Sequence, residues 1–176
     1  AWAVSVLTEA RSFGGSLRDL SDIRSAFPAA TLLRKDFVLD EYMLAESRAH
    51  GADLVLLMVS VLGDRTGEMA GLAFRHRLEP LVEARNPEEI AIAVRSGARM
   101  IGINNRDLDT LTVDLSTGER LLPLLPPGVV PVVESGISKA EEVRRLHKAG
   151  ARLFLIGESL AVASNPADTI RGYMGK

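Results

Sequence analysis

A lysine ends one of the apolar segments of this 176-residue chain. In the stretch TLLRKDFVLDEY, an apolar run leads into Arg34, Lys35 and Asp36, and apolar residues resume at once. Lys35 is either a side chain that leaves the core for solvent with its stem packed on apolar surface, or a positioned catalytic ammonium. This segment alone leaves both interpretations open.

Two other segments that read as buried strands also end in polar residues. Glu83 closes the run PLVE, and Asn104 closes the run MIGIN. A lone asparagine at a strand end is usually a turn former. An ammonium, a carboxylate and an amide at equivalent ends of three strands would instead suit acid–base chemistry on an oxygen-rich substrate.

Similar glycine-containing segments, ESGI (134–137) and IGES (156–159), end the last two apolar runs. Gly136 and Gly157 would allow close approach to the backbone, and Ser135 could add a hydroxyl. Such loops, together with helix N-terminal amides, could bind a phosphate group. The alternative interpretation is ordinary strand-to-helix turn chemistry.

Three further side chains could contact a substrate. Arg106 is suited to a carboxylate or phosphate, although a surface ion pair is its commoner use. Phe13 and Phe37 follow the first two apolar runs and could line a pocket for an aromatic ring, although most phenylalanines are core residues. No His–Glu spacing indicates a metal site, and we interpret the three histidines as structural.

The composition limits the class of protein. Hydrophobic residues make up 47% and charged residues 25% of the chain, and the net charge is −2, so we expect one globular domain over residues 1–176 and no nucleic-acid partner. The absence of cysteine excludes disulfides and thiolate metal sites and fits the cytoplasm. No apolar run reaches the roughly 18 residues of a membrane span, and we expect no signal peptide.

A repeated pattern indicates the elements that position these residues. In HGADLVLLMV, SGARMIGIN and AGARLFLIG, a glycine suited to a helix C-cap precedes an apolar run without polar alternation, which is typical of strands buried on both faces. We expect seven strands, near 3–7, 31–35, 53–59, 78–83, 99–104, 129–134 and 152–157. We expect a helix after each, near 16–26, 40–50, 65–75, 86–96, 114–125, 138–149 and 165–174.

Several helix starts have cap signals, and two of these are Asp40 and a capping box from Ser138 to Glu141. Strict alternation of strands and helices indicates a parallel α/β fold. The segment SFGGSL after the first strand lacks dinucleotide-binding spacing, and no P-loop is present. Because polar residues end nearly every strand, as around a barrel active site, we predict the (β/α)8 TIM-barrel family with about seven βα units.

With these residues assembled, the chain resembles the indole-3-glycerol phosphate synthase family. The matching segments are VSVLTE, F-x-GSL, LLRKDFVLDEYM, ADLVLLMVSVL, LEPLVEA, IGINNRDL, VVESGI and LIGESL. They occur in the family's order at near-family spacing over essentially the whole chain. The resemblance implies a lyase of tryptophan biosynthesis that forms indole-3-glycerol phosphate from 1-(2-carboxyphenylamino)-1-deoxyribulose 5-phosphate, with ring closure and loss of carbon dioxide and water.

The resemblance also implies catalytic roles for three strand-end residues. Lys35 matches the family's general acid on the carbonyl oxygen, and Glu83 matches a glutamate of the dehydration step. Asn104 matches the asparagine that orients the substrate. The family uses no metal or organic cofactor.

The remaining roles concern substrate binding. Arg106 matches a residue near the anthranilate carboxylate, and Phe13 and Phe37 match the apolar pocket around the aromatic ring. The phosphate-binding loops are matched by Ser135, Gly136, Gly157 and Glu158, the last through its backbone.

The chain departs from the family pattern at its start. It matches strands 2–8 of the barrel, without the first strand, its Glu-x-Lys pair or the N-terminal helical segment. We therefore expect low synthase activity of the 176-residue chain alone, and self-association through open barrel edges. The alternative is an inactive truncated barrel that binds at most phosphate or a partner chain. Phosphoribosylanthranilate isomerase, another phosphate-handling barrel, is disfavoured because it requires a cysteine.

Overall fold

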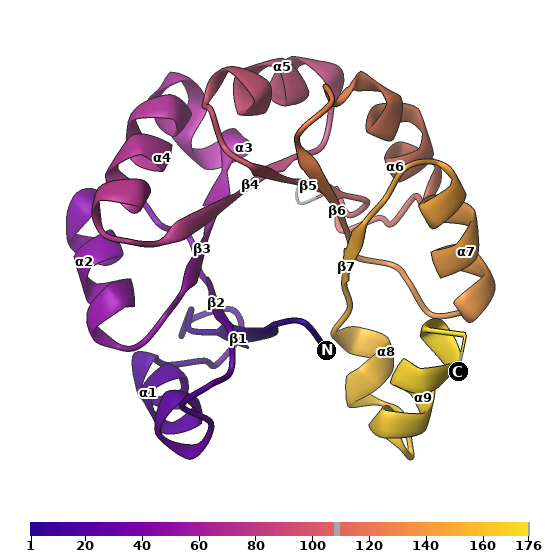
Figure 1. Cartoon of the computed structure of the whole chain (residues 1–176), viewed down its shortest axis with the longest axis horizontal. Coiled ribbons are helices and arrows are strands. Elements are labelled where there is room, and N and C mark those ends of the chain that lie inside the picture. The colour runs from indigo at the N-terminus through magenta and orange to yellow at the C-terminus, as the bar shows by residue number, and fades with distance from the viewer. Residues whose placement is uncertain (108–109, 176) are drawn as a thin grey trace. The chain divides into compact units, whose positions relative to one another are not determined.

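The computed structural model describes residues 1–107 and 110–175 of the protein, in which strands alternate with helices (Figure 1). The chain divides into two compact units. The first comprises Ala1–Glu83 and Ile92–Arg99, and the second comprises Ala84–Ala91 and Met100–Lys176.

The first unit is built on parallel strands that pair in chain order. The strands are β1 (Val4–Leu7), β2 (Leu32–Lys35), β3 (Leu54–Met58) and β4 (Glu79–Ala84). The helices that accompany them are α1 (Leu17–Ala26), α2 (Glu41–Ala49), α3 (Val59–Leu62), the short 3-10 helix η1 (Gly63–Arg65) and α4 (Thr66–Arg75). In Figure 1, α2 and α4 lie along one side of β2 and β3. Helix α5 (Pro87–Arg95) follows β4, and its residues are divided between the two units.

The second unit repeats this arrangement. Its strands are β5 (Met100–Asn104), β6 (Val130–Glu134) and β7 (Leu153–Leu155), paired in parallel in chain order. Its helices are α6 (Ser116–Leu121), the 3-10 helix η2 (Leu122–Leu124), α7 (Ala140–Lys148), α8 (Glu158–Ala161) and α9 (Pro166–Tyr173). Figure 1 shows α6 and α7 on one side of these strands.

The observed elements agree closely with the predicted ones. Every predicted strand and helix occurs within two residues of its expected bounds, except that the helix predicted over 114–125 ends as α-helix at Leu121 and continues as a 3-10 helix to Leu124. All residues of β3 and of β5 are buried, as expected for strands covered on both faces. Gly51, Gly97 and Gly150 have φ values of 93°, 76° and 122°, so the repeated glycines do end helices in the left-handed region.

Two short helices, α3 and α8, were not predicted because four residues are too few for a helical period to show in the sequence. Among the described residues, no helix combines the length and the apolar character that a membrane crossing requires.

The two predicted helix caps have different outcomes. Asp40 caps α2, because its Oδ1 accepts the N–H of Met43 at 2.9 Å. The capping box from Ser138 to Glu141 is wrong. The carboxylate that turns back is that of Glu142, which accepts the backbone N–H groups of Ser138 (2.8 Å) and Lys139 (3.0 Å). The reason is that the N-cap of α7 is Lys139, one residue later than the predicted N-cap Ser138.

A buried arginine holds the end of β2 against α2. Arg34 is 2% exposed. Its Nη1 donates to the Met43 carbonyl (3.1 Å), Glu46 Oε2 (3.0 Å) and Ser47 Oγ (3.0 Å), all in α2. Its Nη2 donates to Asp36 Oδ2 at 2.9 Å. A guanidinium removed from water is tolerated only when its donors are satisfied, so this network fixes the strand end to the helix.

We predict that Arg34→Met destabilises the fold by about 3 kcal/mol, because it leaves partly buried carboxylates and carbonyls without their donor. Urea unfolding followed by circular dichroism would measure the loss. The matched control is Arg18→Met, since Arg18 pairs with Asp22 at 3.6 Å on an exposed surface of α1. The control should stay within about 0.5 kcal/mol of the parent. Equal effects of the two substitutions would contradict the role given to Arg34.

Candidate functional site

Strand register places Lys35 and Glu83 on the same face of the first unit. Successive side chains of a strand point to opposite faces, and Arg34 contacts α2, so Lys35 projects to the face away from that helix. Arg34 is aligned with Val55 in β3, so three residues later Met58 shares the face of Lys35. Met58 is aligned with Glu83, which therefore also lies on that face.

Both residues also lie at the same edge of the first unit. Lys35 is the last residue of β2, and Glu83 is the penultimate residue of β4, with β3 between them. Because these strands are parallel, their carboxyl ends meet at one edge. Glu83 is buried and Lys35 is half-buried. The first unit thus gathers an ammonium and a carboxylate at one strand edge, on the face opposite α2.

The loop after β1 carries Phe13 and is held by a carboxylate. Glu9 accepts the backbone N–H groups of Arg11 (2.8 Å), Ser12 (2.6 Å) and Phe13 (3.2 Å). These hydrogen bonds, that of Ser12 foremost, hold the pKa of the Glu9 carboxyl below its ordinary value of 4.5. Gly15 closes the loop, because a Cβ there would lie 2.2 Å from the Leu7 carbonyl oxygen.

The two predicted pocket phenylalanines are not core residues. Phe13 is 56% exposed and Phe37 is 37% exposed. Phe37 follows β2 directly, and its backbone N–H is bound by the Asp36 carboxylate at 2.8 Å. Each phenylalanine therefore lies in the segment that follows the carboxyl end of a strand, and its ring is accessible to solvent. A role around an aromatic substrate stays a prediction.

In the second unit, Asn104 faces away from the helices and beside a buried carboxylate. The Asn105 side chain accepts the N–H of Gly118 in α6, so the preceding Asn104 points to the opposite face. Asn104 is aligned with Glu134 of β6, which is buried. The sequence interpretation did not include Glu134. Glu134 is the last residue of the run VVE, as Glu83 is the last residue of the run LVE, and this similarity could have identified Glu134.

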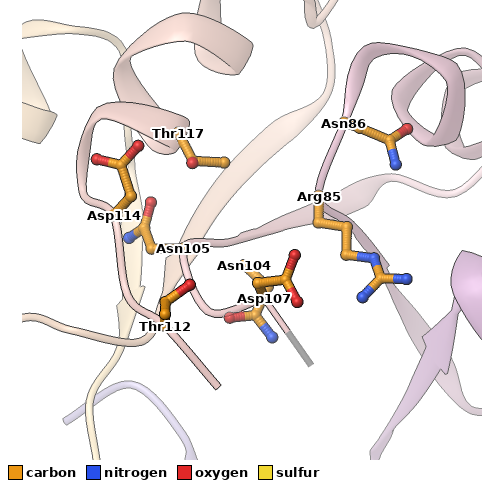
Figure 2. Close-up of a pocket in the computed structure, with 8 residues that line it drawn as sticks. All are labelled: Arg85, Asn86, Asn104, Asn105, Asp107, Thr112, Asp114 and Thr117. Atoms are coloured by element: carbon orange, nitrogen blue, oxygen red, sulfur yellow. The ribbon is translucent and has the colours of Figure 1, made fainter. Parts of the chain in front are cut away.

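A polar cavity of about 440 Å³ lies next to Asn104. Its lining consists of Arg85, Asn86, Asn104, Asn105, Asp107, Thr112, Asp114 and Thr117. Figure 2 shows Arg85 and Asn86 on one side and Asp114 and Thr117 on the other. The Ser116 hydroxyl and backbone N–H hold the pKa of the Asp114 carboxyl below its ordinary value of 3.8. Of the residues predicted for the site, the lining includes Asn104.

Arg106 and Glu158, both predicted site residues, are paired with each other. Arg106 Nη2 lies 3.0 Å from Glu158 Oε2, and Arg106 Nη1 donates to the Leu111 carbonyl at 3.3 Å. The pair joins the loop after β5 to the start of α8. The Arg106 side chain is 32% exposed and that of Glu158 is 81% exposed, so the pair is accessible to solvent. The surface ion pair considered for Arg106 is thus present.

The loop after β6 has a backbone conformation that its residues do not prefer. Ser135 has φ 66°, and Gly136 has φ 78°. A Cβ on Gly136 would lie 2.2 Å from Val113 Cγ1, so glycine is required there. Gly157 has φ −125° at the start of α8, and a Cβ there would meet open space. Only the first predicted phosphate loop therefore shows a structural need for its glycine.

Comparison with known proteins adds to this geometry. A family model described as indole-3-glycerol phosphate synthase matches residues 1–173. The indole-3-glycerol phosphate synthase of Micrococcus luteus is 47% identical over 176 residues, covering 98% of this chain and 65% of the relative. That of Dehalococcoides mccartyi is 44% identical over 174 residues, covering 97% of this chain and 67% of the relative. The chain thus spans about two thirds of the length of these relatives.

Solved structures of other proteins share the fold. The 3-hexulose-6-phosphate synthase of Salmonella typhimurium matches with a TM-score of 0.81 at 15% identity, over 97% of this chain and 84% of that chain. The 3-keto-L-gulonate-6-phosphate decarboxylase of Vibrio cholerae matches with a TM-score of 0.75 at 14% identity, over 97% and 83%. At such identities the likeness shows the fold alone. The predicted fold, consecutive βα units of the (β/α)8 TIM-barrel family, is confirmed.

We predict that the Ser12 amide resonance titrates with a midpoint below 4.5, the ordinary carboxyl value. A depressed pKa in the folded state means that the Glu9 hydrogen bonds are complete above the ordinary value and are lost as the pH falls through the folded value. A pH series of ¹⁵N–¹H spectra measures this. Glu9→Gln should remove the titration and increase exchange of the Ser12 and Phe13 amides, and a midpoint above 4.5 would contradict the assignment.

Proposed function

We propose that this chain, which belongs to the indole-3-glycerol phosphate synthase family, provides catalytic residues at its strand ends for a cytoplasmic carboxy-lyase of tryptophan biosynthesis. The reaction would convert 1-(2-carboxyphenylamino)-1-deoxyribulose 5-phosphate to indole-3-glycerol phosphate. The observation that carries the proposal is the pair Lys35 and Glu83 on one face and one edge of the first unit. We also propose that residues 1–176 form a single domain.

In the proposed mechanism, Lys35 protonates the ketone oxygen as the ring closes. The aromatic carbon that bears the carboxylate attacks the ketone carbon, and the new alkoxide takes the ammonium proton. An ammonium beside that oxygen stabilises the negative charge as it develops. Loss of carbon dioxide then returns the bonding electrons to the ring and restores its aromaticity.

Glu83 would serve the dehydration. Its carboxylate accepts a proton from the new five-membered ring and passes a proton to the departing hydroxyl, which leaves as water. Glu83 is buried near the carboxyl end of β4, at the strand edge that it shares with Lys35, where bulk water does not compete for the transferred proton. The steps release only carbon dioxide and water and transfer no net electrons, so the proposed chemistry requires no redox cofactor.

The other polar residues would hold the substrate. Asn104 would orient the reacting groups, beside the buried carboxylate of Glu134, with which it is aligned in the neighbouring strand. Arg106 would bind the anthranilate carboxylate by exchanging its Glu158 partner for the substrate. Such an exchange costs little, since solvent-accessible ion pairs contribute only about 0–1 kcal/mol.

The substrate's phosphate and its aromatic ring would bind to loops. We assign the phosphate to Ser135 and Gly136 after β6, with the backbone of Gly157 and Glu158 at the start of α8. Backbone N–H groups are suited to phosphate oxygens because they donate without requiring a countercharge. Phe13 and Phe37 would flank the aromatic ring, consistent with their exposure at strand ends.

We predict that Lys35→Met lowers kcat by about 100-fold or more, because the proton donor to the ketone oxygen is lost. Indole-ring fluorescence would follow turnover, both for the chain and for a fusion with the N-terminal part of the Micrococcus luteus synthase placed ahead of Ala1. Lys148→Met, on the exposed surface of α7, is the matched control and should retain parental turnover. A folded fusion without turnover, or an active Lys35→Met variant, would refute the proposed mechanism.

We also propose weak self-association through the β1 edge. Val4 and Leu7 of β1 and the preceding Trp2 are exposed apolar residues. A strand edge with apolar side chains can pair with another chain, and a lysine on it opposes such pairing. Val4→Lys should therefore lower the average mass in sedimentation equilibrium at high concentration. A parental chain that remains monomeric across the concentration range would contradict this proposal.

A further inference from the structure

Asn105 lies directly after the predicted site residue Asn104 and is 2% exposed. Its side-chain Oδ1 accepts the N–H of Gly118 at 2.9 Å, and its Nδ2 donates to the Ser135 carbonyl at 3.0 Å. Its backbone N–H donates to the Glu134 carbonyl (3.0 Å), and its carbonyl accepts the N–H of Asp114 (2.9 Å). The residue thus connects the end of β5 to α6 and to the loop after β6, all within the second unit.

The hydrogen bond from Asn105 acts on a residue, Ser135, whose backbone conformation is disfavoured. Ser135 has φ 66°, a left-handed conformation that a residue with a Cβ disfavours. Such a conformation persists only where the surroundings impose it. The Asn105 amide binds the carbonyl of Ser135 itself, which fixes the orientation of the peptide between Ser135 and Gly136.

That peptide carries the group expected to bind phosphate. In a trans peptide the N–H points opposite to the C=O. Because the Ser135 carbonyl points to Asn105, the N–H of Gly136 points away from Asn105. Gly136 packs closely against Val113 and Leu115, so the loop has little room to compensate for a rotated peptide.

We propose that Asn105 is a positioning residue that sets the Ser135–Gly136 peptide in its phosphate-binding orientation. The inference rests on the proposed function for its ligand, a phosphate monoester, and adds a residue that the sequence interpretation did not include. Asn105 does not contact the ligand. It acts by holding the Ser135 carbonyl, so that the Gly136 N–H is directed before phosphate arrives.

The test uses the whole chain and inorganic phosphate as the probe, with the Gly136 amide resonance as the readout. We expect a saturable shift in the parent. Asn105→Ser shortens the side chain so that it no longer reaches both partners, and should weaken the apparent Kd about tenfold. The matched control, Asn165→Ser, keeps an N-cap residue at the start of α9 and should leave the Kd unchanged.

A second substitution separates positioning from general loosening of the fold. Ser135→Gly removes the penalty of a Cβ in the left-handed conformation, so Asn105→Ser should weaken the Kd less in the Ser135→Gly background than in the parental one. Comparing the two backgrounds cancels the loss of the Ser135 hydroxyl. If Asn105→Ser does not fold, Asn105→Asp keeps an acceptor for Gly118 and loses the donor to Ser135. Asn105→Asp should again weaken the Kd less in the Ser135→Gly background than in the parental one, and its added charge is the same in both backgrounds.

The outcomes of these experiments distinguish the role of Asn105 from the phosphate site and from the proposed activity. A parental Kd in Asn105→Ser, or an equal loss of affinity in the parental and Ser135→Gly backgrounds, overturns the role of Asn105 while the phosphate site stands. A parent whose Gly136 amide does not respond to phosphate overturns the site and the inference together. Absence of turnover in the fluorescence assay, with phosphate binding intact, contradicts the proposed activity and leaves the role of Asn105 supported.

Discussion

The alternation of side chains along parallel strands is the constraint from which the rest of the candidate site follows. At each strand end, one residue faces the helices and its neighbour faces the opposite side. In β2 these are Arg34, bound to α2, and Lys35; after β5 they are Asn105, bound to α6, and Asn104. The helix-facing residue of each pair is buried and hydrogen-bonded to a helix, which fixes the direction in which its neighbour can project.

This division explains which features the sequence could predict. The strands were predictable because buried parallel strands are apolar throughout and follow left-handed glycines such as Gly51 and Gly97. The strand-end positions of Lys35 and Glu83 followed from those strands. The sequence did not reveal the burial of Arg34 or the role of Asn105, because a charge or an amide next to a candidate site residue looks the same whether it faces water or a helix.

The loops are held by a different interaction, carboxylates that accept backbone N–H groups. Glu9 does so after β1, where these bonds lower the pKa of its carboxyl. Asp114 does so before α6, and the Ser116 hydroxyl, followed by the Ser116 N–H, lowers the pKa of its carboxyl. These contacts are local, within four residues of the carboxylate, yet the sequence analysis did not anticipate them. A loop with an acidic residue has many possible turns, and only the folded backbone selects the one in which the N–H groups converge.

Burial, rather than residue type, separates a scaffold arginine from one that is available to a ligand. Arg34 and Arg106 each pair with a glutamate at 3.0 Å. Removing Arg34 from its partners would leave a buried guanidinium without acceptors, so opening that pair would be costly in free energy. Arg106 and Glu158 are hydrated in either state, so their separation changes little in free energy. Under the proposed function, a substrate carboxylate that offers Arg106 a bidentate geometry displaces Glu158, and the ion pair seen in the free protein is the resting state of a binding residue.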